Sequence, residues 1–170
     1  PATKQTRKTP KAKPRYSVAD YFPLRVGDRR IYKIRFASTK QVIQREIRIA
    51  SKKGEIFFDN QKPQESYQID PYGLRGRNRY LLKYPLRVGT RWLSVTGLTS
   101  VERYVIIHTD REVAVPAGSF KHCVVVQSRD SRGSHGVLEA RFYFAPNTGL
   151  VKITTTLEKG KQRYPQWKLE

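Results

Sequence analysis

Cysteine is almost absent from this chain, because Cys123 is the only one among its 170 residues. An intramolecular disulfide and a cysteine-based zinc site are therefore both excluded. Histidine is also rare, with three residues far apart in the sequence at His108, His122 and His135. Their spacing lacks the His/Glu/Asp patterns of metal sites, so the sequence predicts neither a metal nor a cofactor.

Long apolar runs are missing as well. The longest, such as residues 104–107, are far too short to cross a bilayer, and no signal peptide is visible. The chain begins at Pro1 and contains no methionine. Two interpretations of its compartment stay open on these grounds. Loss of an initiator methionine fits a cytoplasmic protein, whereas removal of a longer leader fits an exported one.

Acidic residues are scarce. There are 14 Asp and Glu against 34 Lys and Arg, which gives a formal net charge of +20. A charge of this size says little about the fold, but it attracts anions to the surface, such as nucleic acid, an anionic envelope surface or an acidic protein. The length suits one domain that buries a core without disulfides or metals.

The first 16 residues have the composition of a tail. They combine basic residues with three prolines, of which Pro10 and Pro14 break any helix, and the first acidic residue is Asp20. Such a segment cannot bury enough apolar surface to fold alone. We therefore predict a flexible basic tail over 1–16 and a single β domain over 17–170. We expect an anionic partner to order the tail through its basic side chains, Lys4, Arg7, Lys8, Lys11, Lys13 and Arg15.

From Tyr21 onward, short runs of β-branched and aromatic residues alternate with polar ones. This period of two places one face of a strand on a core and the other in water, as in antiparallel sheets. The only helical signal is a single turn that Ser17 caps and Pro23 ends. We predict an all-β fold, with an antiparallel, strongly curved sheet that forms a sandwich or open barrel of about ten strands. The expected strands are 32–36, 42–49, 54–59, 79–84, 90–97, 101–109, 111–116, 122–129, 138–144 and 151–156.

Turn signals separate these strands. A phrase with Pro-Leu-Arg-Val-Gly occurs twice, at 23–27 and at 85–89, and each copy precedes a strand with an aromatic residue. We expect a duplicated turn that leads into two parts of the sheet, or a chance recurrence of a common turn. Two further turns are predicted at 116–118 and 146–149.

Four phrases in a fixed order suggest a family. They are Phe-Pro-Leu-x-x-Gly (22–27), Pro-Leu-x-x-Gly-x-x-Trp (85–92), Val-Pro-Ala-Gly-Ser-Phe-Lys-x-Cys-Val-x-Val (115–126) and Tyr-Phe-Ala-Pro-Asn-Thr-Gly-Leu-Val-Lys (143–152). In this order they resemble a group of bacterial envelope domains, often lipoproteins, whose function is generally unknown. The resemblance covers about residues 21–156. It implies an antiparallel β fold and an extracytoplasmic location, in the periplasm or cell envelope, and it implies no reaction.

No pattern of residues points to catalysis. The serines of the segment 128–134 lack a nucleophile elbow, and the glycines of the segment 73–77 lack a Walker lysine and a following helix. Cys123 precedes three valines and is expected to be a small buried side chain. Alternation along the strands predicts that the carboxylate of Glu139 is solvated. The sequence therefore predicts a protein that is not an enzyme.

Arginine and tyrosine gather in two segments that we expect to be loops. One follows Asp70, and the other is a mobile hairpin loop near position 130. Arginine beside an aromatic ring can bind phosphates, stack on bases or bind acidic protein loops. The alternative is that these are ordinary solvated charges. The candidate partner-binding residues of the loops are Arg75, Arg77, Arg79, Tyr72, Arg129 and Arg132.

Three functions remain open from the sequence. The first is a non-enzymatic interaction module, a subunit or accessory protein of a bacterial envelope assembly, that binds an acidic partner through its basic surface and tail. The second is a nucleic-acid-binding protein, associated with RNA, ribosomes or DNA, whose affinity falls steeply with salt. The third is a small-ligand carrier with a cavity in its sheet. The third is the weakest, because no sequence feature marks a pocket.

Overall fold

The computed structural model describes residues 16–95, 97 and 100–170. The described part consists almost entirely of strands. In chain order its elements are α1 (Val18–Tyr21), β1 (Arg29–Phe36), β2 (Val42–Lys53), β3 (Ile56–Asp59), β4 (Ser66–Asp70), β5 (Gly73–Arg75), β6 (Tyr80–Lys83), β7 (Arg91–Val95), β8 (Val101–Val115), β9 (Gly118–Ser131), the 3₁₀ turn η1 (Gly133–His135), β10 (Val137–Ala145), β11 (Gly149–Lys159) and β12 (Gln162–Leu169). The predicted tail lies outside the described residues, apart from Tyr16.

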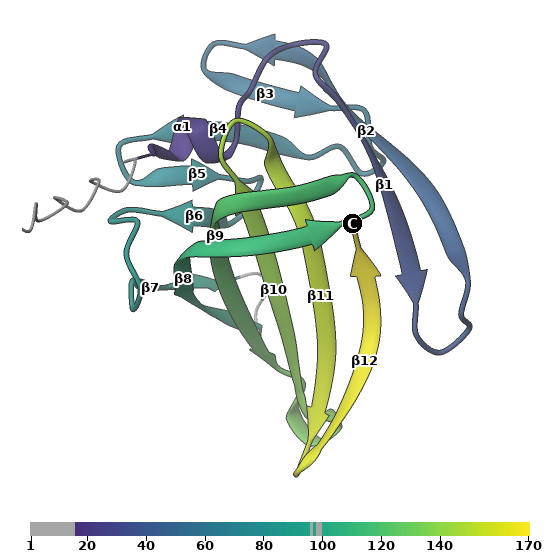
Figure 1. Ribbon diagram of the computed structural model, residues 1–170. Helices are drawn as coiled ribbons and strands as arrows, with labels where there is room; N and C mark the ends of the chain where they lie inside the picture. Colours follow the sequence, from purple (N-terminus) through teal and green to yellow (C-terminus); the bar gives the residue numbers. More distant parts are fainter. Residues whose placement is uncertain (1–15, 96, 98–99) are drawn as a thin grey trace, which may run out of the picture.

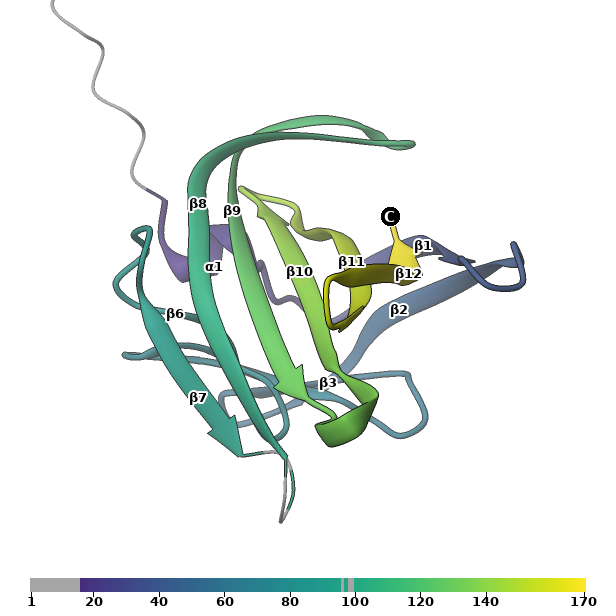
Figure 2. The ribbon, with the colours of Figure 1, turned by 90° about the horizontal axis from the view of Figure 1, so that it is seen from below.

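All twelve strands belong to one antiparallel sheet in the order β6-β5-β4-β3-β2-β1-β12-β11-β10-β9-β8-β7 (Figure 1). Neighbours in the chain are neighbours in the sheet, except that β1 pairs with β12 and that β6 and β7 form the two edges. The sheet curves until these edges approach each other, which gives a nearly closed barrel (Figure 2). The Trp92 indole N–H of β7 donates to the Tyr80 carbonyl of β6 at 3.0 Å. The all-β prediction is therefore confirmed, with twelve strands instead of about ten.

Three strands of the structure were not predicted from the sequence. They are β4, β5 and β12, which the alternation pattern did not reveal. A fourth difference concerns β8, which is one strand of 15 residues where two were expected. Its pairing with β9 shifts register three times between Ile106 and Val113. Each shift bends the strand and increases its twist without ending it.

The repeated Pro-Leu-Arg-Val-Gly phrase forms two equivalent turns. Gly27 and Gly89 both have a positive φ, 95° and 90°, which a side chain would strain. Each glycine N–H donates to a neighbouring strand at a matching place, to the Ile49 carbonyl of β2 in the first copy and to the Ile106 carbonyl of β8 in the second. The turns at 116–118 and 146–149 are also present, as predicted.

The main core lies on the inner face of the sheet. Trp92 and Tyr104 stack there with ring centroids 5.2 Å apart, and Phe144 is 1% exposed. The short helix α1 adds Val18 and Tyr21 to the same cluster. The predicted Ser17 cap is present as a capping box: the Asp20 N–H donates to the Ser17 hydroxyl at 3.2 Å, and the Ser17 N–H donates to the Asp20 carboxylate at 2.7 Å.

A separate small core lies on the outer face. The far ends of β8 and β9 form a hairpin that bends over the outer surface of β10 and β11 (Figures 1 and 2). There Val113 and Cys123 of the hairpin pack on Ala145 and Val151 of the sheet. This packing covers one end of the outer face and leaves the rest of it free for the polar side chains described next.

Candidate functional site

Cationic side chains from six strands share the outer face of the sheet. Strand register shows this directly, because Arg141, Thr154, Lys168 and Arg35 lie opposite one another in turn across β10, β11, β12 and β1. Residues that face each other across an antiparallel ladder point to the same side. We use the name outer basic face for eight of the cations on this side, which are Lys33, Arg35, Arg103, Arg129, Arg141, Lys152, Arg163 and Lys168.

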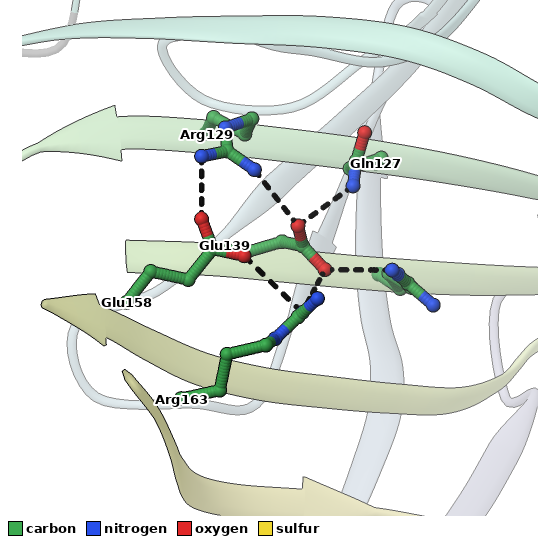
Figure 3. A network of polar contacts seen from close by, with 6 residues as sticks. Gln127, Arg129, Glu139, Glu158 and Arg163 are labelled. Carbon is green, nitrogen blue, oxygen red and sulfur yellow. Dashed lines mark hydrogen bonds and ion pairs between the residues drawn. The ribbon is translucent and has the colours of Figure 1, made fainter. Parts of the chain in front are cut away.

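Glu139 lies at the centre of a polar network on this face (Figure 3). Its carboxylate contacts the guanidinium groups of Arg129 at 3.1 Å, Arg141 at 2.9 Å and Arg163 at 3.0 Å. It also accepts a hydrogen bond of 2.7 Å from the side-chain amide of Gln127. The carboxylate is 4% exposed, so the prediction that Glu139 is solvated is wrong. Alternation gave the correct face of the strand, but arginines from three strands cover the acid.

Glu158 extends the network. Its carboxylate contacts Arg129 at 2.5 Å and Arg163 at 3.3 Å. The two glutamates therefore share two of their three arginines, as the dashed contacts of Figure 3 show. The arginine side chains remain 38–52% exposed, whereas Glu139 and Glu158 are 4% and 17% exposed. The carboxylates thus lie beneath, and the cations point to solvent.

The same layering recurs at the C-terminal end of the face. Glu170, 6% exposed, pairs with Arg35 at 3.5 Å and with the ammonium group of Lys168. Lys152 lies beside them, with its ammonium 5.7 Å from the ring centroid of Tyr143. Partial burial, and then the neighbouring charge of Lys168, lower the pKa of Lys152. The cations of this face are therefore crowded enough to perturb one another.

The sequence-predicted loop residues occupy different places. Arg129 was expected in a mobile hairpin loop but lies within β9, where the glutamate network holds it. Arg132 does lie at the turn before η1, and its Nε pairs with Asp130 at 2.9 Å. Tyr72 lies in the β4–β5 turn and is 65% exposed, while Arg75 is an exposed residue of β5. The tail candidates Lys4, Arg7, Lys8, Lys11, Lys13 and Arg15 lie outside the described residues.

Arg77 and Arg79 line a cavity on the inner face instead. The cavity has a volume of about 380 Å³ and lies among β2, the β3–β4 loop, the β5–β6 turn and strands β10 to β12. We call it the inner cavity. Its apolar lining consists of Phe22, Ile47, Pro63, Tyr67, Leu81, Phe142, Phe144, Leu150, Ile153 and Leu169, and its polar lining of Arg45, Asp59, Gln61, Lys62, Glu65, Gly76, Arg77 and Arg79.

A buried carboxylate orders the loop at the mouth of the inner cavity. Asp59 is completely buried and accepts hydrogen bonds from the N–H groups of Gln61 and Glu65, each at 3.0 Å, and from the Tyr67 hydroxyl at 3.2 Å. Burial, reinforced by the charge of Asp59, raises the pKa of Tyr67. The Asp59 carboxylate is therefore occupied by donors of its own loop.

The cavity arginines differ in their partners. One amino group of Arg79 contacts both oxygens of the Glu102 carboxylate, each at 3.1 Å, and this fixes the side chain between the two edges of the barrel. Arg45 and Arg77 form no ion pair or hydrogen bond with the described residues. In the sequence, Arg45 alternates with Ile43, Ile47 and Ile49 on one side of the strand. This cation within an apolar stripe is the signal that could have revealed the cavity.

The glycine-rich segment 73–77 does not cradle a phosphate. The N–H groups of Tyr72 and Gly73 donate to the Asp70 carboxylate at 2.8 Å and 3.0 Å, so they are already used by the turn. Gly73 also lies against the neighbouring strand, where an added Cβ would fall 2.1 Å from the Leu82 carbonyl oxygen. This glycine therefore serves the close approach of β5 and β6.

The single thiol and the potential metal ligands form no reactive centre among the described residues. Cys123 is fully buried, and burial raises the pKa of its thiol to about 11. Within the described ranges, no group of three or more His, Cys, Asp or Glu side chains could hold a metal ion. Across those same ranges, no helix is long and apolar enough to cross a membrane.

Comparison with known proteins returns no relative. Neither a protein-family model, nor a curated protein, nor a solved structure matches the chain. The resemblance to bacterial envelope domains therefore stays a prediction from the four sequence phrases. The surfaces of this chain that can bind a partner or ligand are the outer basic face and the inner cavity.

Proposed function

We propose that this chain is a non-enzymatic interaction module that binds an acidic protein partner on the outer basic face. The observation that carries the proposal is the layering of charge on this face. The carboxylates of Glu139, Glu158 and Glu170 are at most 17% exposed, while the arginines and lysine above them are exposed by 38% or more. A partner therefore contacts mainly cations. The buried glutamates hold the guanidinium groups in place, where they can bind carboxylates of the partner.

The apolar residues of the same face favour a protein over a nucleic acid. Ile31 and Val42 point to the side of Lys33 and Arg35 and are 46% and 47% exposed. Protein interfaces combine an apolar centre with a polar rim, and arginine is enriched in them relative to the rest of the surface. Binding of a nucleic-acid backbone requires only cations, and binding of unpaired bases requires aromatic side chains on which the bases stack. An acidic protein surface is the partner that uses both features.

The N-terminal tail and the compartment belong to the same proposal. The six basic residues of the tail would extend the contact along an acidic partner. Their positive charge and the low apolar content of the tail agree with this role. The sequence phrases shared with envelope domains support a place in the bacterial envelope or periplasm. Detection of the protein only in the cytosolic fraction of its source cells would contradict this location.

The test compares two variants with equal loss of charge. Lys33→Gln, Arg103→Gln and Lys152→Gln together neutralise three cations of the outer basic face that form no ion pair with the described residues; Lys33 and Arg103 are exposed, and Lys152 is partly buried. The matched control neutralises Arg25, Lys53 and Arg87, which are also exposed and do not belong to the outer basic face. Three surface contacts of about 0.5 kcal/mol each correspond to about a tenfold change in affinity.

The assay is fluorescence anisotropy with labelled poly-L-glutamate at about 0.15 M salt, with a DNA duplex as a second probe. We expect the outer-face variant to bind poly-L-glutamate about tenfold more weakly and the control variant to change little. Deletion of residues 1–15 should weaken binding further without lowering the melting temperature. Equal losses of affinity in the two variants would show that binding depends only on net charge, and this would reject the proposal. A loss confined to the DNA probe would favour nucleic acid instead.

A further inference from the structure

The inner cavity has the composition of a ligand site. Its floor includes side chains of three consecutive strands, Phe142 of β10, Ile153 of β11 and Leu169 of β12. Its volume of about 380 Å³ falls within the range of about 300–1,000 Å³ that small-molecule sites occupy. An apolar cavity with a few polar groups at its mouth selects a ligand that has one apolar part and one polar end.

The polar end of such a ligand would meet cations that have no other partner. Arg45 reaches the cavity from β2 and Arg77 from the β5–β6 turn, and neither is engaged by the described residues. Lys62 lies at the same mouth. Asp59 is present too, but its carboxylate accepts three hydrogen bonds from its own loop. Two free guanidinium groups next to an apolar floor match a carboxylate or phosphate on an alkyl chain.

We propose that the inner cavity binds a single-chain amphiphile whose carboxylate or phosphate head group contacts Arg45 and Arg77 and whose alkyl chain lies on the apolar floor. This site is separate from the outer basic face. Arg45 and Arg48 illustrate the separation, because they lie on opposite sides of β2, the first at the cavity and the second on the outside. The inference therefore does not depend on the proposed protein partner.

The first experiment varies the ligand and uses titration calorimetry on the full chain. Decanoate and decyl phosphate are the probes, with hexanoate, decanol and inorganic phosphate as comparisons. Each buried methylene contributes about fourfold to affinity, so hexanoate should bind on the order of 100-fold more weakly than decanoate. Decanol should bind at least about tenfold more weakly, because it lacks the charge that the arginines recognise. Inorganic phosphate should show no comparable binding, because it lacks the chain.

The second experiment varies the protein. Arg45→Gln with Arg77→Gln removes the two free cavity cations, and Arg48→Gln with Arg75→Gln removes two exposed arginines that lie next to them in the chain but outside the cavity lining. We expect at least a tenfold loss of decanoate affinity in the first variant and less than a twofold change in the second. Leu81→Phe enlarges a side chain of the lining and should weaken decanoate binding while a thermal melt shows that the fold is intact.

Three results would overturn the proposal. They are equal affinity for decanoate and decanol, equal losses in the two arginine variants, and inorganic phosphate binding as tightly as decyl phosphate. None of these results bears on poly-L-glutamate binding by the outer basic face. Failure of the amphiphile site and failure of the protein-binding proposal can therefore be told apart in the same set of variants.

Discussion

Replacement of Glu139 by glutamine is the sharpest test of the charge layering on the outer face. Glu139→Gln keeps the size of the side chain but removes the charge that Arg129, Arg141 and Arg163 share, within 3.1 Å of each. It also places an amide N–H₂ group among arginine donors, which cannot accept from them. The variant should therefore fold to the same sheet with a lower free energy of unfolding.

The magnitude follows from the exposure of the partners. Removal of one member of a fully buried ion pair costs about 3–5 kcal/mol, because the remaining charge stays buried. Here the three arginine side chains are 38–52% exposed and can turn toward water. We therefore expect about half of that cost, about 2 kcal/mol. For a chain of this length this corresponds to a melting temperature lower by about 4–8 °C.

Urea unfolding followed by tryptophan fluorescence measures this change in the free energy of unfolding. An unchanged slope of this free energy against urea concentration would show that the same surface is exposed on unfolding. Glu46→Gln is the matched control. Its side chain is 43% exposed and lies 3.4 Å from Arg29 on the surface, so its loss should stay below about 0.5 kcal/mol. If Glu139→Gln is as stable as Glu46→Gln, the network contributes nothing and the reasoning from burial is refuted.

Two further predictions concern single groups. Because burial raises the pKa of Cys123 to about 11, about one thiol in a thousand is ionised at pH 8. We therefore expect iodoacetamide to modify the chain only after unfolding, and rapid alkylation of the folded protein would contradict this. Hydrogen bonds from the Ser17 N–H and hydroxyl, each 2.7 Å, lower the pKa of Asp20. The Asp20 carboxylate therefore stabilises the fold above its unfolded pKa of about 3.9, and this stabilisation is lost as the pH falls through the lowered folded value. Asp20→Ala should cost about 1 kcal/mol at pH 7 and progressively less in urea unfolding below pH 4, and a cost that does not depend on pH would contradict the capping role.

The sequence predicted the fold class because alternation is a local property. The two inward residues Tyr32 and Ile34 and the outward Lys33 and Arg35 alternate within a single strand, and the structure buries the first pair and exposes the second. Strand β12 was missed because Pro165 interrupts its alternation, and proline is unusual inside a strand. The sheet accepts Pro165 opposite Thr156, next to a shift in register with β11. A tertiary irregularity of this kind leaves no trace in the pattern of a single strand.

The environment of Glu139 could not be predicted for a related reason. Alternation states which side of β10 the carboxylate occupies, but its burial depends on Arg129 of β9 and Arg163 of β12, whose positions follow from the register of other strand pairs. Arg45 is the opposite case. Its place in an apolar stripe was visible in the sequence, yet only the curvature of the sheet brings it to the same cavity as Arg77.

The two candidate surfaces follow from one property of the sheet. In β12, Lys168 points to the outer basic face while its neighbours Trp167 and Leu169 pack on the inner face, and in β2 the same division separates Arg48 from Arg45. A slip of register by one residue would exchange the two sets and place charges in the core. The buried residues of the inner face therefore fix the register, and the register in turn fixes which cations are presented outside. The strands that enclose the inner cavity thus also set the spacing of the arginines and lysines available to a partner.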